Sequence, residues 1–372
     1  MKIIKNLVVG CGLSGATIAR KIAEDFNSPV VIIDERNTLG GNAYDYRDEN
    51  GITVHHYGSH IFHTSREDVW KWVNRFASFN TYMHRVVALI DGIETTAPFN
   101  LRTLHRVFPL TLAKRIEEKL LERFEYNARV PITELKQQTE DADLKFLADY
   151  VYRKVFEEYT DKQWGDSLDE AGKRAVTSRA PILISCDERY FQDKYQGIPL
   201  CGYTELVRRM LDHPNIELRL GVFYCDVTEE WERLFYTGSI DEFFDYRYGR
   251  LPYRSVRLDL ETHNVPFYQS NAVVNYPCNY DFTRIHEYKY YLNEQSEKTV
   301  IAKEYPEEYI PGVNERFYPV NCAKSLELYA KYAQAAQTLS NVHFFGRLGS
   351  YRYYDMDAAI AKALELYNSL QK

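Results

Sequence analysis

The feature that most constrains the fold is a glycine-rich segment near the N-terminus. Gly10, Gly12 and Gly15 are spaced as G-x-G-x-x-G. The apolar run at residues 3–9 comes directly before them and predicts a buried strand, whereas residues 15–25 have the apolar spacing of an amphipathic helix. A glycine-rich turn between a strand and a helix is the first part of a dinucleotide-binding Rossmann unit.

Each position in this turn has a physical task in such a unit. Gly10 allows a tight turn, Gly12 lets the backbone approach a pyrophosphate, and Gly15 lets the helix pack closely on the strand. The start of the helix offers free N–H groups and a partial positive charge. We therefore expect Gly10, Gly12, Leu13 and Gly15 to contact the phosphates of a dinucleotide.

A second apolar run, residues 30–33, predicts the next strand and ends at Asp34, 19 residues after Gly15. An acid at this place accepts hydrogen bonds from the adenosine ribose. Gly40 and Gly41 follow about six residues later, which is similar to the extended signature of the glutathione-reductase-type flavoproteins. This pair favours FAD over NAD, although an ordinary loop remains the alternative.

Composition and charge limit the other possibilities. A chain of 372 residues with 45% hydrophobic and 27% charged residues is a folded protein of two to three domains. The net charge of −7 argues against a general nucleic-acid binder. The six cysteines form no C-x-x-C pair and no zinc spacing, which favours a reducing compartment. The apolar N-terminal run is interrupted by glycines and has no cleavage site, and no stretch approaches a membrane span, so we expect a soluble, cytoplasmic protein.

Four histidines lie close together in residues 51–64, namely His55, His56, His60 and His63. Metal binding is one interpretation of this cluster. However, Gly58 and the β-branched residues before it favour a strand followed by a loop, and no nearby carboxylate completes a ligand set. We expect a histidine-bearing loop beside the cofactor and no metal.

The remaining patterns predict a regular order of elements. They are a helix at 65–76 with Ser65 as its N-cap, a hairpin at 83–97 around Asp91-Gly92, helices over 100–165, strand and helix signals at 197–227, an antiparallel sheet at 250–292, a strand at 342–345 and a helix at 355–370.

These elements predict an α/β fold in which a Rossmann-type FAD-binding domain is interrupted by a helical domain and an antiparallel β-sheet domain. The expected FAD-binding domain is discontinuous and consists of residues 1–82, 197–246 and 335–372. Residues 100–196 form the expected helical domain, and residues 83–99 and 247–334 form the expected sheet domain.

Four segments carry a more specific resemblance. They are GSHIFHT at 58–64, YTDKQW at 159–164, YTGSIDEFF at 236–244 and FFGRLGSYRYYDMD at 344–357. In this order, and over essentially the whole chain, the sequence resembles the bacterial UDP-galactopyranose mutase family.

The resemblance implies an isomerase, an intramolecular transferase that interconverts UDP-galactopyranose and UDP-galactofuranose and supplies galactofuranose for cell-surface glycans. It implies a non-covalent FAD that is active when reduced, although the reaction has no net redox change. In the implied mechanism the flavin N5 attacks the anomeric carbon and expels UDP. The resulting adduct opens as an iminium, the sugar recloses through another hydroxyl, and UDP returns. A homodimer is also implied.

The resemblance further implies the roles of individual residues. Arg179, on a mobile substrate loop, and Arg284 would clamp the diphosphate, and His63 would lie beside the flavin ring. The implied substrate contacts are Phe156, Tyr159 and Thr160 at the uracil end, together with Trp164, Tyr190, Asn275, Tyr318, Tyr353 and His84. The implied cofactor contacts, besides the glycine-rich turn, are Asp34, Glu35, Gly41, Asn42, His60, Ile61, Val222, Arg347, Met356 and Asp357.

Two positions depart from the family pattern. Ser59 stands where relatives carry proline or alanine, and His84 stands where some carry a substrate-contacting asparagine. Sugar specificity, including tolerance for a 2-acetamido group, is therefore open.

Two other classes of protein remain as alternatives. One is an amine oxidase-like flavin oxidoreductase, which would show net redox turnover on the same dinucleotide fold. The other is a non-catalytic FAD-dependent protein that binds the nucleotide sugar without converting it.

Overall fold

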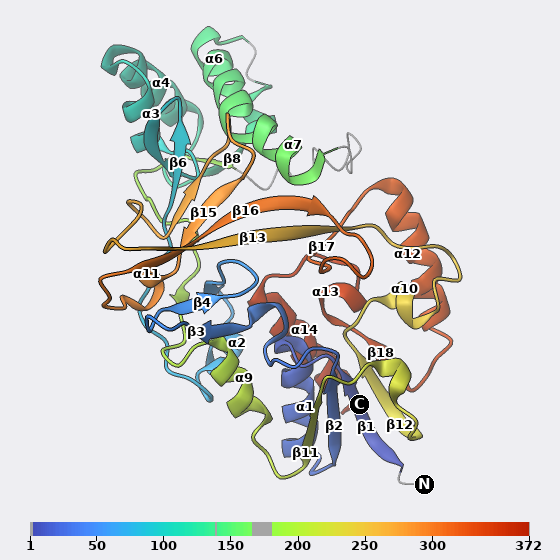
Figure 1. Cartoon of the computed structure of the whole chain (residues 1–372). Helices are drawn as coiled ribbons and strands as arrows, with labels where there is room; N and C mark the ends of the chain where they lie inside the picture. The colour runs from blue at the N-terminus through green and yellow to red at the C-terminus, as the bar shows by residue number, and fades with distance from the viewer. Residues whose placement is uncertain (1–2, 138–139, 166–180, 372) are drawn as a thin grey trace.

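The computed structural model describes residues 3–137, 140–165 and 181–371. Within this part of the chain, two main sheets organise the molecule. Figure 1 shows the long strands of the second sheet crossing the middle of the view, with the first sheet below them and most of the helices of residues 101–164 above.

The first sheet is five-stranded in the described residues, and every pairing in it is parallel. Its order is β11 (Ile216–Leu220), β2 (Val30–Asp34), β1 (Ile4–Val9), β12 (Trp231–Tyr236) and β18 (Val342–Phe344). The expected strands at 3–9, 30–33 and 342–345 are thereby confirmed, and the Rossmann-type α/β architecture with them.

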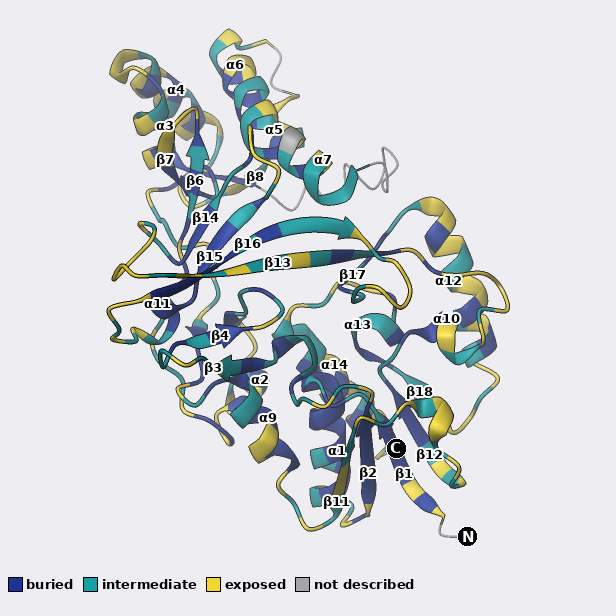
Figure 2. Ribbon diagram, viewed as in Figure 1, coloured by how far each residue is buried: buried dark blue, intermediate teal, exposed yellow. Residues whose placement is uncertain are grey.

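The apolar runs of β1 and β2 are continuous because both faces of this sheet are covered (Figure 2). Val8 and Ile32 belong to the core on one face, where α1 (Leu13–Asp25), α9 (Tyr203–Leu211) and α14 (Met356–Ser369) pack. Leu7 and Ile33 point into a smaller cluster on the opposite face. Successive side chains of a strand point to opposite faces of the sheet, and this alternation divides them between the two cores.

The second sheet is seven-stranded and largely antiparallel in the described residues, as expected for the antiparallel region. Its order is β17 (Tyr318–Pro319), β13 (Tyr253–His263), β16 (Thr299–Glu308), β15 (Arg284–Glu287), β14 (Val273–Asn275), β6 (Val86–Ile90) and β7 (Ile93–Ala97). Asp91 and Gly92 connect β6 to β7 with positive φ angles of 49° and 81°, which confirms the hairpin expected there.

The segment from 101 to 164 is mainly helical and has its own apolar core. It contains α3 (Leu101–Val107), α4 (Leu110–Arg123), α5 (Ile132–Leu135), α6 (Ala142–Val151), the π-helical turn η2 (Tyr152–Glu157) and α7 (Glu158–Trp164). A short strand pair that the sequence did not indicate, β8 (Arg129–Pro131) with β9 (Pro181–Leu183), closes this segment.

Smaller elements connect these layers. They are η1 (Gly41–Ala43), β3 (Asp45–Arg47), β4 (Thr53–His55), β5 (Phe62–Thr64), α2 (Glu67–Val73), β10 (Tyr195–Gly197), η4 (Tyr224–Asp226), α10 (Ile240–Phe243), α11 (Lys289–Leu292), α12 (Ala323–Ala336) and α13 (Gly346–Gly349).

Three sequence expectations differ from the structure. Ser65 is not an N-cap, because α2 begins at Glu67 and the Ser65 hydroxyl instead donates to Asp193 (2.6 Å). Helix α1 begins at Leu13, two residues earlier than its apolar pattern predicted. Two expected domain limits fall inside elements, at 196/197 in β10 and at 334/335 in α12, so the division into domains stays a prediction.

Among the described helices, none is both long and apolar enough to cross a bilayer. All six cysteines lie in the described residues and are free thiols.

Candidate functional site

The glycine-rich turn lies at the carboxyl end of β1, where α1 begins. A Cβ on Gly15 would lie 1.8 Å from the Gly10 carbonyl oxygen, and one on Gly10 would lie 2.0 Å from the Thr237 hydroxyl oxygen. Gly10 also has a φ of +98°, which L side chains rarely adopt. These two glycines are therefore required by the packing of the chain itself.

Gly12 differs from its neighbours. Its φ is −73°, and a Cβ there would make only ordinary contacts of 3.7 Å, with Gly40 and Gly41. No conformational reason demands a glycine at this position, so the missing side chain leaves space for a group that approaches the turn. The first N–H groups of α1 lack intrahelical partners, as at every helix start, and can bind phosphate oxygens. The turn fits a dinucleotide.

Asp34 ends β2 beside this turn and is buried. Its two carboxylate oxygens accept hydrogen bonds from the backbone N–H groups of Cys11 (2.8 Å) and Arg36 (2.9 Å). The residue expected to hold the ribose thus also fixes the loop that follows β1. Glu35, next in sequence, is exposed as a residue, but partial desolvation of its carboxyl, together with the charges of Glu242 and Asp34, raises its pKa.

The other expected cofactor contacts come from separate segments. Asn42 is in η1 and accepts from Arg36 (3.1 Å), and Val222 follows β11 and donates its N–H to the Asp34 carbonyl (2.9 Å). His60 and Ile61 lie between β4 and β5, Arg347 lies in α13, and Met356 and Asp357 begin α14. Asp357 accepts from Thr64 (2.9 Å), which ties α14 to β5.

Arg284 and Asn275 are brought together by strand register. They are directly opposite each other in the β14–β15 pair, and Arg284 is also opposite Glu304 in the β15–β16 pair. The Arg284 Nε lies 3.2 Å from Glu304 Oε1. The Oδ1 atom of Asn275 is buried and has no hydrogen-bond partner in the described residues, as expected for a group that meets a ligand.

Helix α7 places Tyr159 and Trp164 over this part of the sheet. The Arg284 guanidinium donates to the Tyr159 hydroxyl. Trp164 and Tyr318 line one shallow pocket together with Glu304 and Arg254. Two polar contacts dock the helix on the sheet: Arg254 Nε donates to the Gln163 carbonyl (3.0 Å), and Lys162 Nζ donates to the Tyr276 carbonyl (2.9 Å).

Arg347 and two tyrosines form a second group beside the pocket. The rings of Tyr318 and Tyr353 are 5.5 Å apart, and the Arg347 guanidinium lies 5.5 and 5.2 Å from their centres. The guanidinium donates to the carbonyls of Phe317 (3.2 Å) and Tyr354 (2.8 Å), so its position is fixed by the backbone. An expected cofactor contact and two expected substrate contacts are therefore adjacent.

His63 and His84 both stack on Phe191. His63 stacks on the Phe191 ring with centres 3.6 Å apart, and its Nδ1 lies 2.8 Å from Asp193 Oδ2. His84 is buried, stacks on the same ring at 5.8 Å, and contacts the Tyr82 hydroxyl through Nδ1 (3.2 Å). Burial, aided by the neighbouring His286 and Arg284, lowers the pKa of His84 to about 3, so the ring is neutral.

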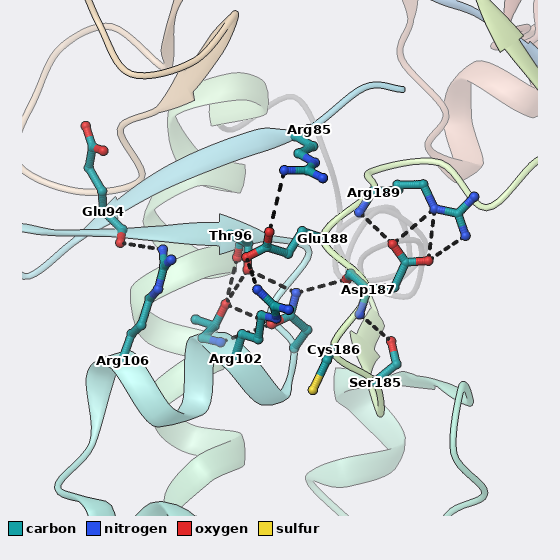
Figure 3. Close-up of polar contacts among 12 residues, drawn as sticks. Arg85, Glu94, Thr96, Arg102, Arg106, Ser185, Cys186, Asp187, Glu188 and Arg189 are labelled. Atoms are coloured by element: carbon teal, nitrogen blue, oxygen red, sulfur yellow. Dashed lines mark hydrogen bonds and ion pairs between the residues drawn. The ribbon is translucent and has the colours of Figure 1, made fainter. Parts of the chain in front are cut away.

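The segment that leads to Tyr190 is held by a cluster of charges, which Figure 3 shows. Glu188 forms ion pairs with Arg85 (3.7 Å) and Arg102 (3.6 Å). Asp187 accepts from the backbone N–H of Arg189 (2.9 Å) and from its guanidinium. Tyr190 itself donates its N–H to the His84 carbonyl (2.8 Å) and has an exposed ring.

Two expected substrate contacts lie deeper in the fold, since Phe156 and Thr160 are both buried. Phe156 belongs to the helical core. Arg179 lies outside the described residues.

Sequence reasoning missed Glu304, whose carboxylate sits between Arg284 and His286. Burial alone raises its pKa, but the charge of Arg284 and the hydrogen bond from His286 reverse this and lower it to about 2. The negative charge of Glu304 in turn raises the pKa of Arg284, although burial of the guanidinium acts in the opposite direction. A carboxylate at a core-facing position of a strand was the available signal.

The histidines of residues 51–64 do not converge on one point. His55 is buried against Tyr291, His56 is exposed, and His63 faces Phe191. Across the described residues, no group of three or more His, Cys, Asp or Glu side chains is arranged to hold a metal ion.

Comparison with known protein families gives two matches. A family described as UDP-galactopyranose mutase matches residues 154–353, and a family described as NAD(P)-binding Rossmann-like domain matches residues 8–76.

Full-length relatives agree with the first match. The chain is 38% identical to a dTDP-fucopyranose mutase of Escherichia coli, with 97% of each chain covered. It is also 38% identical to a probable UDP-galactopyranose mutase of Klebsiella pneumoniae, over 97% of this chain and 93% of the relative. A UDP-galactopyranose mutase of Mycoplasma pneumoniae is 33% identical, with 96% and 94% covered.

Solved structures show the same fold at low identity. A reduced UDP-galactopyranose mutase has a TM-score of 0.70 and 15% identity, with all of this chain and 94% of that chain covered. A putative protoporphyrinogen oxidase from Exiguobacterium has a TM-score of 0.64 and 12% identity, with 100% and 99% covered. The fold is thus shared by mutases and oxidoreductases, and it does not by itself separate them.

Proposed function

The chain belongs to the UDP-galactopyranose mutase family, and from this premise we propose that it interconverts UDP-galactopyranose and UDP-galactofuranose with a bound, reduced FAD. The observation that carries the proposal is the cluster in which the half-buried Arg284 meets Tyr159 of α7, beside the pocket lined by Trp164 and Tyr318. A cation beside aromatic faces matches a ligand with a diphosphate, a base and a sugar.

The proposed cofactor site is the glycine-rich turn with the segments around it. The open side of Gly12 and the start of α1 would receive the pyrophosphate, and Asp34 and Glu35 lie where the ribose would be. His60, Arg347 and Asp357 would lie further along the cofactor. When bound and reduced, the flavin supplies the nucleophile that this ring exchange needs.

The residues of the chain would bind and orient the substrate. Arg284 would neutralise the diphosphate as it leaves the sugar, and Arg179 would assist it from outside the described residues. Tyr159, Trp164, Tyr318 and Tyr353 offer flat apolar faces with a polar edge. His63, oriented by Asp193 and Phe191, and His84 would stand on the sugar side.

The decisive experiment is a conversion assay on the purified, flavin-loaded protein. UDP-galactofuranose is incubated with and without dithionite, and the products are separated by chromatography. Conversion to UDP-galactopyranose only in the reduced sample supports the proposal. Oxidation of an added amine or sugar with consumption of oxygen, and no conversion, would instead support an oxidoreductase. Binding of UDP without either reaction would indicate a non-catalytic protein.

A second substrate is favoured by one observation. The E. coli relative that is named for dTDP-fucopyranose is as similar to this chain, at 38% identity, as the K. pneumoniae relative named for UDP-galactopyranose. We therefore include dTDP-fucofuranose in the same assay. A kcat/KM for dTDP-fucofuranose more than about tenfold above that for UDP-galactofuranose, a difference of about 1.4 kcal/mol, would assign the deoxysugar nucleotide as the substrate.

We further propose that the protein acts as a homodimer, which the family resemblance supports, and that it acts in the cytoplasm, which its six free cysteines support. Light scattering and cell fractionation test these two points.

A further inference from the structure

A line of hydrogen bonds runs from the loop that carries His60 to Arg284. Ser59 lies in the loop between β4 and β5, His286 lies in β15, and Glu304 lies in β16. The Ser59 hydroxyl is 2.6 Å from His286 Nδ1, and His286 Nε2 is 2.9 Å from Glu304 Oε2. The Tyr291 hydroxyl, from α11, donates to Ser59.

Strand geometry explains why these groups meet. Arg284 and His286 are two residues apart on β15 and therefore point to the same face of the sheet. Glu304 is directly opposite Arg284 on β16. Its carboxylate consequently has Arg284 on one side and His286 on the other, and its Oε1 also accepts from the Thr283 hydroxyl (3.0 Å).

The chemistry of the partners determines which atom is the donor in each of these hydrogen bonds. A carboxylate only accepts, so His286 Nε2 must carry a hydrogen. Burial lowers the pKa of His286, despite the carboxylate beside it, so the ring is neutral and Nδ1 is an acceptor. Ser59 must then donate to Nδ1, which leaves its oxygen free to accept from Tyr291. The three donations all point toward Glu304.

We propose that His286, oriented by Ser59, is a positioning residue that holds the Glu304 carboxylate and through it the Arg284 guanidinium in the geometry that binds the substrate diphosphate. This inference rests on the proposed role of Arg284. It adds a link between the cofactor-side loop and the diphosphate site through Ser59 and His286, neither of which lines the pocket beside Trp164.

The mechanism depends on desolvation. His286 is 1% exposed and Glu304 8% exposed, so a donor that Glu304 loses on the His286 side is poorly replaced by water. Without His286, the carboxylate keeps Arg284 as its main charged partner and can rotate toward it. That movement would draw the guanidinium away from the ligand.

The test measures UDP affinity by calorimetry on the flavin-loaded protein. We expect His286→Ala to weaken UDP binding about tenfold and Ser59→Ala about threefold, with flavin content unchanged. His286→Gln, whose amide can still donate to Glu304, should restore binding to within about threefold. His105→Ala, which breaks a similar His–carboxylate contact with Glu117 (2.6 Å) in the helical segment, is the matched control and should bind UDP normally.

A double-mutant cycle separates positioning from general structural support. If His286 acts through Glu304, His286→Ala should weaken UDP binding in the wild type but hardly at all in Glu304→Gln. Additive effects would overturn the proposal, and so would normal UDP affinity in His286→Ala. If His286→Ala does not fold, unchanged affinity in Ser59→Ala has the same force.

Different results would contradict the proposed function and this inference. Absence of UDP binding by the wild type, or full affinity in Arg284→Ala, contradicts the role of Arg284 itself. Normal wild-type binding that Arg284→Ala reduces but His286→Ala does not would contradict only the positioning role.

Discussion

At the scale of single residues, the glycines of the first turn have two different reasons to be glycine. Gly15 is required because its neighbour, the Gly10 backbone, leaves no space for a Cβ. Gly12 has a common backbone conformation and free space, so its glycine serves whatever approaches the turn. The same glycine-rich turn therefore contains one glycine that folding requires, Gly15, and one that serves binding, Gly12.

These two reasons predict different phenotypes. Gly15→Ala should destabilise the flavin-free chain by about 1–3 kcal/mol, because a rigid carbonyl lies in the way. Gly12→Ala should leave the flavin-free stability within about 0.5 kcal/mol but lower the flavin-to-protein ratio. Urea unfolding and absorbance at 450 nm measure the two effects. Equal unfolding midpoints for both variants would contradict this assignment.

Arg284 is the residue whose loss should affect catalysis most. Arg284→Ala should lower kcat/KM about 100-fold or more, because it removes a charge-assisted contact to the leaving diphosphate and leaves Glu304 buried without its partner. The flavin content should stay normal, since the residue lies on the sheet away from the glycine-rich turn. Steady-state kinetics and the flavin spectrum provide the check, and near-normal turnover would exclude Arg284 from the mechanism.

At the scale of elements, the substrate side depends on how α7 meets the seven-stranded sheet. The helix carries Tyr159 and Trp164, and its polar contacts with the sheet side include those of Gln163 with Arg254 and of Lys162 with Tyr276. The π-helical turn η2 precedes it, and within that turn Lys154 is paired with Asp91 of the β6–β7 hairpin (2.7 Å). The sheet thus determines where the aromatic residues of α7 stand.

Loosening this docking should weaken ligand binding. Arg254→Ala removes the hydrogen bond to the Gln163 carbonyl, worth about 1 kcal/mol. UDP affinity should fall about fivefold while flavin content is unchanged. Arg219→Ala, which breaks surface ion pairs with Glu217 and Glu229 on β11, should bind UDP as the wild type does. Unaltered affinity in Arg254→Ala would show that this hydrogen bond is not needed to position α7.

At the scale of the whole molecule, several neutral histidines are enclosed between the two sheets. Burial lowers the pKa of His55, His60 and His84 to about 3, and neighbouring positive groups add to the effect. In the unfolded chain the same side chains take up a proton near pH 6.5. As the pH falls below that value, the unfolded state binds more protons, and stability is lost.

The protein should therefore be acid-sensitive well above the range of its carboxylates. Each of the three histidines should remove about 1.4 kcal/mol per pH unit between pH 6.5 and pH 3. Urea unfolding at pH 7.5, 6.5 and 5.5 measures the slope. His55→Asn, whose amide oxygen can still accept from the His60 N–H (3.1 Å in the native contact), should lower that slope by about 1.4 kcal/mol per pH unit, which is the contribution of His55. A pH-independent midpoint over this range would contradict the argument.

Patterns in the amino-acid sequence were enough to predict the local features of this protein. Strand β1, helix α1 and strand β2 follow from apolar periodicity, and the β6–β7 turn follows from Asp91-Gly92, because these patterns reflect interactions between near neighbours. Four specific segments also sufficed to recognise the family. The expected roles of the individual site residues remain predictions, because they were assigned by motif, and no bound ligand tests them.

Contacts between side chains that are distant in the sequence became visible in the folded structure. Glu304 gains its importance because β16 pairs with β15 in one register, and a shift of a single residue would place it on the other face. Ser59 and Tyr291 join His286 because a loop and a short helix 232 positions apart fold against the same strand. Ser65 does not cap α2 as expected, because its hydroxyl donates to Asp193, which lies 128 positions away. Such contacts depend on the whole fold, so no local pattern encodes them.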